Sequence, residues 1–109
     1  MVGKYKVITL CGSARFENDF LREQKRLTLE GNIVISVGFF SNANNDEIFS
    51  DNTKLMLGDM HKRKIDMADE IFVINKDGYI GSSTKSEIEY AINTGKKVNY
   101  MENIELGNN

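Results

Sequence analysis

One acidic side chain near the end of the chain, Glu87, is well placed to do chemistry. It follows a glycine- and hydroxyl-rich turn, Gly78-Tyr-Ile-Gly-Ser-Ser-Thr84, which itself follows an apolar run at residues 71–74. In α/β proteins a turn of this kind lies at the carboxyl edge of a parallel sheet, where ligands bind. A carboxylate at that edge can act as a nucleophile toward a sugar carbon.

The same glutamate also has a purely structural interpretation. Thr84 and Glu87 have the spacing of a capping box, in which the Glu87 side chain accepts a hydrogen bond from the backbone N–H of Thr84. Spacing alone favours the cap, because capping boxes are common and catalytic carboxylates are rare. Glu89 points about 200 degrees away around the helix and cannot share the catalytic role.

An earlier turn repeats the strand-turn-helix pattern. The apolar run that ends at Cys11 continues into Gly12-Ser-Ala-Arg15. Free backbone N–H groups at a helix start favour an anion, and Arg15 can hold a phosphate through two hydrogen bonds. The alternative is that Ser13 is an ordinary helix cap and Arg15 a solvated side chain. Both turns can face one pocket, because the carboxyl ends of parallel strands meet at one edge.

Familiar cofactor motifs are absent from the sequence. After Gly12 the second and third glycines of the dinucleotide fingerprint are missing, and no Gly-x4-Gly-Lys-Ser/Thr P-loop occurs. Cys11 and His61, the only cysteine and the only histidine, are far apart and have no recognisable metal-ligand spacing. We therefore expect no cofactor and no metal.

The segment around His61 has helical spacing and a partly apolar face. A histidine on such a face is more often a packed residue than an acid or base. Three methionines of the same segment are most simply interpreted as core packing: Met56, Met60 and Met67.

The elements that must position these residues alternate between strand and helix. Apolar, β-branched runs predict strands at 5–11, 33–37, 70–75 and 97–101, and helical spacing predicts helices at 14–30, 51–68 and 84–94. Because crossovers between parallel strands are right-handed, we expect a small doubly wound parallel sheet of the flavodoxin or Rossmann-like type. The expected strand order is 2-1-3-4, with room for a fifth short strand. The 109 residues suit a single domain, 1–109.

Charge and hydropathy restrict the partners. A net charge of -2 and a pI of about 5.4 provide no sequence-independent attraction to phosphates, so we expect a small molecule rather than a nucleic-acid polymer. No apolar run approaches the roughly 18 residues that span a bilayer, and the N-terminus lacks the blocks of a signal peptide. These features predict no membrane association and a cytoplasmic location, which the lone cysteine also fits.

These motifs together resemble one family, the nucleoside 2-deoxyribosyltransferase-like proteins, which include the deoxynucleoside 5'-monophosphate N-glycosidases. The resemblance covers nearly the whole chain, from the turn at 11–15 to Gly95-Lys-Lys-Val98. It is most specific to a small bacterial and phage branch with a His-Lys-Arg-Lys-Ile-Asp helix, here residues 61–66. The resemblance implies that Glu87 attacks the anomeric carbon. It therefore favours the nucleophile over the helix cap that spacing alone favours.

The resemblance also implies a phosphate site built from the two turns. Its residues would be Gly12, Ser13, Arg15, Gly81, Ser82, Ser83 and Thr84. Gly81 stands where the monophosphate glycosidases often have a serine.

Two further roles complete the predicted site, the first from the resemblance and the second from the position of two aromatics just past the second predicted strand. His61 stands where the family enzymes commonly place an aspartate, so His61 or Asp59 would handle the proton on the departing base. Phe39 or Phe40 could stack on that base, although burial in the core is equally plausible.

We therefore predict cleavage or transfer of the N-glycosidic bond of a 2'-deoxynucleoside or its 5'-monophosphate, by an enzyme that forms a dimer or a larger homo-oligomer. A different class is a non-catalytic module that binds a nucleotide or a nucleotide-derived signal in the same pocket. A Glu87 that serves only as a helix cap would fit the module. A weaker third hypothesis is a flavodoxin-like redox protein, against which a colourless purified protein would count.

Overall fold

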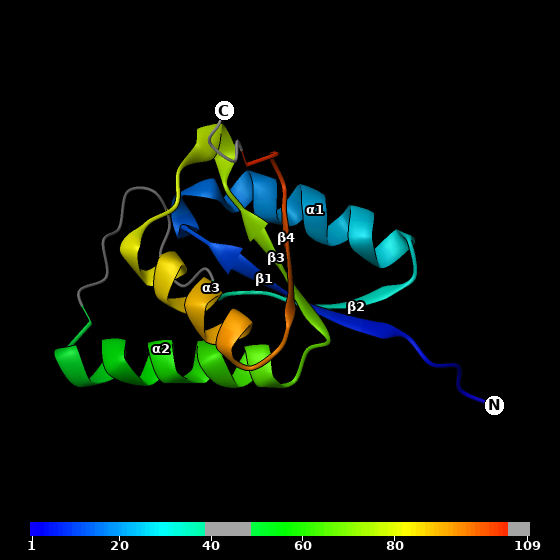
Figure 1. The fold of residues 1–109 in the computed structure, drawn as a ribbon, viewed down its shortest axis with the longest axis horizontal. Coiled ribbons are helices and arrows are strands. Elements are labelled where there is room, and N and C mark those ends of the chain that lie inside the picture. The colour runs from blue at the N-terminus through cyan, green and yellow to red at the C-terminus, as the bar shows by residue number, and fades with distance from the viewer. Residues whose placement is uncertain (39–48, 105–109) are drawn as a thin grey trace.

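A computed structural model describes residues 1–38 and 49–104, which form a parallel sheet between two helical layers (Figure 1). The strands of the sheet are β1 (Lys6–Gly12), β2 (Asn32–Ile35), β3 (Glu70–Ile74) and β4 (Lys97–Tyr100). Their order is β2-β1-β3-β4 and every pairing is parallel. The predicted doubly wound α/β fold and its strand order are confirmed. Within the described residues the sheet has four strands, so the fifth short strand is not found there.

The helices follow their predicted ranges to within a few residues. They are α1 (Glu17–Leu29), α2 (Asp51–Asp66) and α3 (Ser82–Asn93), with short 3-10 turns η1 (Ala14–Phe16) and η2 (Lys76–Gly78). The predicted helix at 14–30 is therefore split into η1 and α1. Ser50 caps α2, since its Oγ accepts a hydrogen bond of 3.1 Å from the backbone N–H of Thr53.

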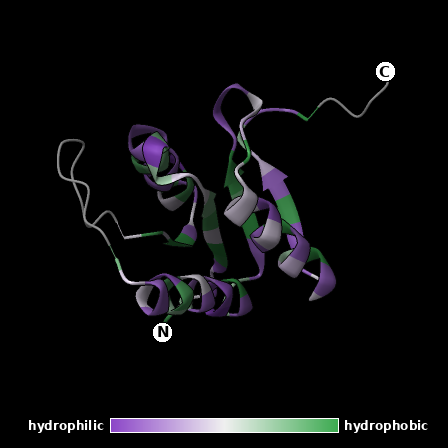
Figure 2. Ribbon diagram, turned by 90° about the vertical axis from the view of Figure 1, so that its left-hand side faces the viewer, coloured by the Kyte–Doolittle hydropathy of each residue, from purple (hydrophilic) through white to green (hydrophobic). Residues whose placement is uncertain are grey.

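Each face of the sheet is covered by a different helical layer, and alternate strand residues point to opposite faces. Phe20 and Leu27 of α1 pack against Ile8 and Leu10 of β1 and Ile74 of β3. The hydrophobic residues are concentrated in the central strands, whereas the helices are mixed in character (Figure 2).

The opposite face of the sheet packs against α2 and α3. Ile65 of α2 and Ile88 of α3 form a cluster with Cys11, Ile71 and Val73 of the strands. Because β1 leads to α1 on one face and β3 leads to α3 on the other, the carboxyl ends of β1 and β3 form the switch point of the sheet.

Gly12 is needed where β1 ends. A Cβ atom at this position would lie 2.8 Å from the backbone oxygen of Ile74 and 3.2 Å from the Phe20 ring, and the φ angle is +152°. Only glycine fits that close approach of β1, β3 and α1 without displacing backbone.

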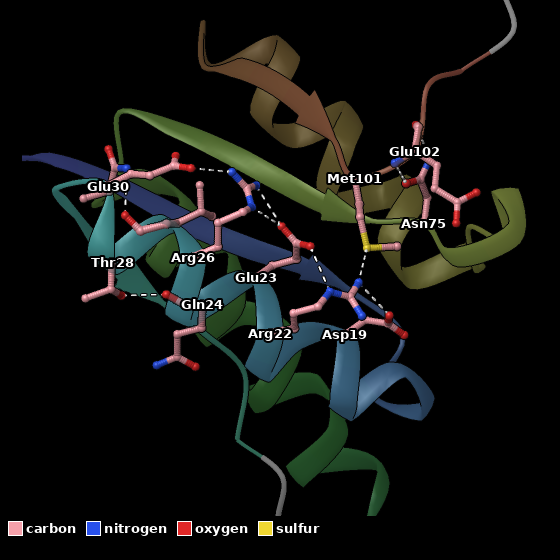
Figure 3. A network of polar contacts seen from close by, with 12 residues as sticks. Asp19, Arg22, Glu23, Gln24, Arg26, Thr28, Glu30, Asn75, Met101 and Glu102 are labelled. Carbon is pink, nitrogen blue, oxygen red and sulfur yellow. Dashed lines mark hydrogen bonds and ion pairs between the residues drawn. The ribbon is translucent and has the colours of Figure 1, made fainter.

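The polar side of α1 carries a network of charges (Figure 3). The buried carboxylates of Asp19 and Glu23 pair with Arg22 at 2.8 Å and Arg26 at 2.7 Å. The Arg22 guanidinium also donates to the sulfur of Met101, just after β4, at 3.4 Å. The network therefore satisfies the buried carboxylates and ties α1 to the end of β4.

Met56 and Met60 of α2 and its C-cap residue Met67 do not pack in the core as predicted. Met56, Met60 and Met67 are 52%, 43% and 62% exposed, whereas His61 and Ile65 of the same helix are buried. The helix buries only a narrow strip, so apolar side chains outside that strip remain at the surface. Across residues 1–38 and 49–104, no helix has the length and apolar content needed to cross a membrane.

Candidate functional site

An open cavity of about 1420 Å³ lies at the switch point of the sheet. Its walls come from η1 and the start of α1, from α2, from the turn after β3 and from α3. Open α/β sheets bind ligands at this position, outside the carboxyl ends of the strands. Among the described residues, five basic side chains line the cavity. They are Arg15, Arg22, Lys54, Lys64 and Lys76.

Three side chains from three different elements meet beside this cavity. Cys11 comes from β1, His61 from α2 and Glu87 from α3. The Cys11 Sγ atom lies 3.3 Å from His61 Nε2, and the same nitrogen lies 3.6 Å from Glu87 Oε1. Cys11 is fully buried, and His61 and Glu87 line the cavity with side chains that are 8% and 16% exposed. The cluster is thus a compact polar group between the cavity and the core.

Burial shifts the proton affinities of all three groups. It raises the pKa of Glu87 to about 7, although the hydrogen bond from Cys11 and the charge of Lys62 oppose the shift. It lowers the pKa of His61 to about 4, and the charge of Lys64 adds to that effect. Burial, followed by the charge of Glu87, raises the pKa of the Cys11 thiol well above its usual range.

At neutral pH the cluster therefore holds a neutral imidazole and a thiol, while Glu87 is divided between its acid and carboxylate forms. The contact between His61 and Glu87 is not an ion pair under these conditions, because the imidazole carries no charge. A separation of 3.6 Å is also too long for a good hydrogen bond. The predicted packed character of His61 is confirmed by its burial, and the residue nevertheless faces the cavity.

The capping-box interpretation of Glu87 is wrong. Helix α3 begins at Ser82 with Gly81 as its N-cap, and no side chain bonds to the helix start at that cap. Thr84 lies within the helix and is buried, which moves Glu87 into the second turn. Capping therefore does not account for Glu87.

The predicted phosphate site is brought together in part. Arg15 and Ser83 line the cavity with Glu87. Ser13 acts as the cap of η1, accepting a hydrogen bond of 3.3 Å from the backbone N–H of Arg15. Arg15 is not simply solvated, because its guanidinium lies 4.4 Å from the centre of the Tyr79 ring.

The other predicted phosphate residues lie in the same two turns but do not line the cavity. Gly12 ends β1, Gly81 is the N-cap of α3, and Ser82 and Thr84 lie in its first turn. The predicted base-stacking residues Phe39 and Phe40 lie outside the described residues.

Asp59 and His61 line two different hollows. It lines a second, shallower depression of about 380 Å³, together with Lys62, Ser86 and Glu87. Residues two apart on a helix point about 200 degrees away from each other, which separates Asp59 from His61. Glu87 lines both hollows and so lies between the two candidate proton-handling residues.

Two kinds of residue at this site were not predicted from the sequence. Cys11 could have been found as the last side chain of β1 on the face that α2 and α3 cover. No feature of the sequence marks Lys54 and Lys64 as site residues, because lysines are common on exposed helical surfaces. The Nζ atom of Lys64 donates to the backbone oxygen of Ser36 at 2.9 Å, which holds its charge close to the cavity.

Comparisons with family models, with curated proteins and with solved structures each produced no match. The fold and the site define a doubly wound α/β protein with a largely buried thiol, imidazole and carboxyl cluster beside the cavity at the carboxyl edge of its sheet.

Proposed function

We propose that the protein cleaves or transfers the N-glycosidic bond of a 2'-deoxynucleoside or its 5'-monophosphate, with Glu87 as the nucleophile. The observation that carries this proposal is the position of Glu87: a largely buried carboxyl that faces the cavity at the switch point and is not used as a helix cap. The resemblance to nucleoside 2-deoxyribosyltransferase-like proteins supports the same role for this residue.

The reaction would take place in two displacements. The ionised Glu87 oxygen attacks the anomeric carbon, and the C–N bond breaks with its electron pair leaving on the base. Water, or a second base in a transfer reaction, then attacks the same carbon and releases the carboxylate. With a pKa of about 7, half of Glu87 is ionised at neutral pH, and its burial leaves the carboxylate poorly hydrated.

The proton for the departing base needs another source. His61 would be an imidazolium only near pH 4 and below, so at neutral pH it contacts Glu87 as a neutral group. A general acid should have a pKa close to the working pH. We therefore propose that solvent in the open cavity supplies this proton, because Asp59 lines the shallower depression and not the cavity.

The test is chromatography of free base released from a panel of 2'-deoxynucleosides and their 5'-monophosphates, with and without an acceptor base. Release from at least one substrate is the expected result, and formation of a new nucleoside would identify a transferase. Intact substrates, together with measurable binding of a nucleotide, would instead identify the non-catalytic binding module.

A 5'-phosphate would be held by Arg15 on the cavity wall. Replacing Arg15 by alanine is expected to raise KM for a 5'-monophosphate by about tenfold or more, because charge-assisted hydrogen bonds contribute about 1.5 to 3 kcal/mol. The KM for the matching deoxynucleoside should change little. Arg63→Ala, at an exposed α2 position paired with Asp66 at 3.9 Å, is the matched control. Equal changes for both substrates would contradict a phosphate role.

We also propose that the protein is a homo-oligomer that associates through α2. Met56 and Met60 of this helix and its C-cap residue Met67 are exposed, and Met60 also lines the cavity. A second copy packed there would bury apolar side chains and narrow the cavity mouth.

Sedimentation velocity tests this association. The double variant Met56→Glu with Met67→Glu is expected to sediment as a monomer, because charges buried in an interface are costly. Leu21→Glu, a change at an α1 side chain with similar exposure of 51%, should leave the assembly intact. A wild-type protein that is monomeric at micromolar concentration would rule the proposal out.

A further inference from the structure

We propose that Cys11, His61 and Glu87 form a binding site for one divalent transition-metal ion of the Zn²⁺ type, with its fourth coordination position open to the cavity. The three residues are distant in sequence, but their ligand atoms all lie within 4.8 Å of one another. This site goes beyond the proposed glycosyl chemistry, which needs no metal.

The spacing of the ligand atoms is close to that of a tetrahedral site. Zinc bonds of about 2.3 Å to sulfur and about 2.0 Å to nitrogen or oxygen place sulfur and nitrogen about 3.5 Å apart, and nitrogen and oxygen about 3.3 Å apart. The corresponding distances are 3.3 Å from Cys11 Sγ to His61 Nε2 and 3.6 Å from that nitrogen to Glu87 Oε1. The third pair, Cys11 Sγ and a Glu87 carboxylate oxygen, lies within 4.8 Å, so side-chain adjustment can bring all three groups to one ion.

The orientation of the imidazole favours a metal over a nucleophilic triad. In a triad the two ring nitrogens contact different partners, one the nucleophile and the other the orienting carboxylate. Here a single atom, Nε2 of His61, makes both short contacts, to Cys11 and to Glu87. The other two ligand groups therefore approach the imidazole at the same nitrogen.

The chemistry of the three ligands suits zinc and related ions. Thiolate, imidazole and carboxylate are all established zinc ligands, and His61 is already in the neutral form that binds a metal. Binding displaces the thiol proton of Cys11 and the proton of any protonated Glu87, which both leave as H⁺, and it forms metal–sulfur and metal–oxygen bonds without any change of oxidation state. A dication with one thiolate and one carboxylate forms a neutral site, which limits the cost of burying charge.

The residues around the cluster determine the entry route of an ion and the coordination position that stays open. Cys11 is backed by Ile65 and Ile88 of the core cluster, whereas His61 and Glu87 line the cavity, so we expect an ion to enter from the cavity side. Three protein ligands leave one tetrahedral position, which is the arrangement of zinc sites that also bind water or a substrate. That position faces the cavity.

One consequence rests on the proposed function. If Glu87 is the nucleophile, an ion bound to its carboxylate prevents attack on the anomeric carbon. Zn²⁺ should then inhibit base release, and a chelator should restore it. The site would make the activity sensitive to free zinc.

The experiment titrates the full chain, first stripped with a chelator, with Co²⁺ in the absence of substrate. One equivalent per chain is expected to produce the absorption of tetrahedral cobalt and a thiolate-to-cobalt charge-transfer band, and Zn²⁺ should displace it. Cys11→Ser should abolish the charge-transfer band. Glu87→Gln should keep the band and weaken affinity by about a hundredfold or more, since even outer-shell changes cost 10- to 100-fold. Glu89→Gln, at an exposed position of the same helix, is the matched control and should bind as the wild type does.

Absence of the charge-transfer band in the wild type, or an unchanged band in Cys11→Ser, would overturn the metal site. Glu87→Gln provides an independent test if Cys11→Ser fails to fold, because wild-type affinity in that variant would also overturn it. Base release assayed in chelator tests the glycosyl reaction separately. Cobalt binding without base release would therefore reject only the proposed function, and base release without cobalt binding only the metal site.

Discussion

Replacing Glu87 by glutamine is expected to abolish release of base from a deoxynucleoside substrate, with a fall in kcat of roughly a thousandfold or more. Glutamine keeps the size of the side chain but cannot form the glycosyl ester, because its amide oxygen is a poor nucleophile. The largely buried side chain at this position faces the cavity, so the substitution removes the reacting atom and changes little else. Substrate binding should persist, since the cavity wall and its basic residues are unchanged.

The control for this prediction is Glu89→Gln, which changes the same residue type on the exposed side of α3. It should retain wild-type activity, because Glu89 and Glu87 point in different directions around the helix. Single-turnover assays with chromatography of the released base measure the effect in both variants. Turnover by Glu87→Gln within a factor of ten of the wild type would show that another group attacks the sugar, or that no covalent step occurs.

The same substitution is expected to change how stability depends on pH. The pKa of Glu87 is raised from 4.5 to about 7 in the folded protein, so folding favours the protonated form. That contribution to stability is fully present below pH 4.5 and is lost as pH rises toward 7. Relative to the wild type, Glu87→Gln should therefore gain stability between these pH values, by about 2 to 3 kcal/mol at most, given about 1.4 kcal/mol per pKa unit.

His61 contributes with the opposite sign. Its pKa falls from 6.5 to about 4 on folding, so its contribution is fully present above pH 6.5 and is lost as pH falls toward 4. In the wild type the two groups oppose each other between pH 4.5 and 6.5, which flattens the stability profile. In Glu87→Gln only the His61 effect remains, so this variant should become more stable as pH rises across that window.

Urea unfolding in chelator at pH 4.5 and at pH 8 measures these differences. Other titrating groups are shared by the two proteins and cancel in the comparison. A stability difference between Glu87→Gln and the wild type that does not vary with pH would show that the Glu87 carboxyl titrates normally. It would then not have the buried environment described above.

The elements of this fold are largely local properties of the sequence. The apolar runs at β1 and β3 and the helical spacing of α1 through α3 predicted nearly all of the regular structure, because periodic burial determines each element. The right-handed crossover rule then restricts the strand order, which the structure confirms. The exposure of Met56, Met60 and Met67 was not predicted. Helical periodicity identifies a helix, but it does not show how much of the helix surface is buried.

The site depended much more on tertiary structure. The sequence by itself identified Glu87, His61 and Arg15 as candidates and placed the turns that carry them at one sheet edge. Only the fold decided that Cys11 and His61, which lie 50 residues apart, meet Glu87 at one point. It also decided that Asp59 faces a separate hollow and that α3 begins before Thr84. Burial, proton affinity and distances between side chains arise when β1, α2 and α3 pack together. The spacing of residues in the sequence does not reveal these properties.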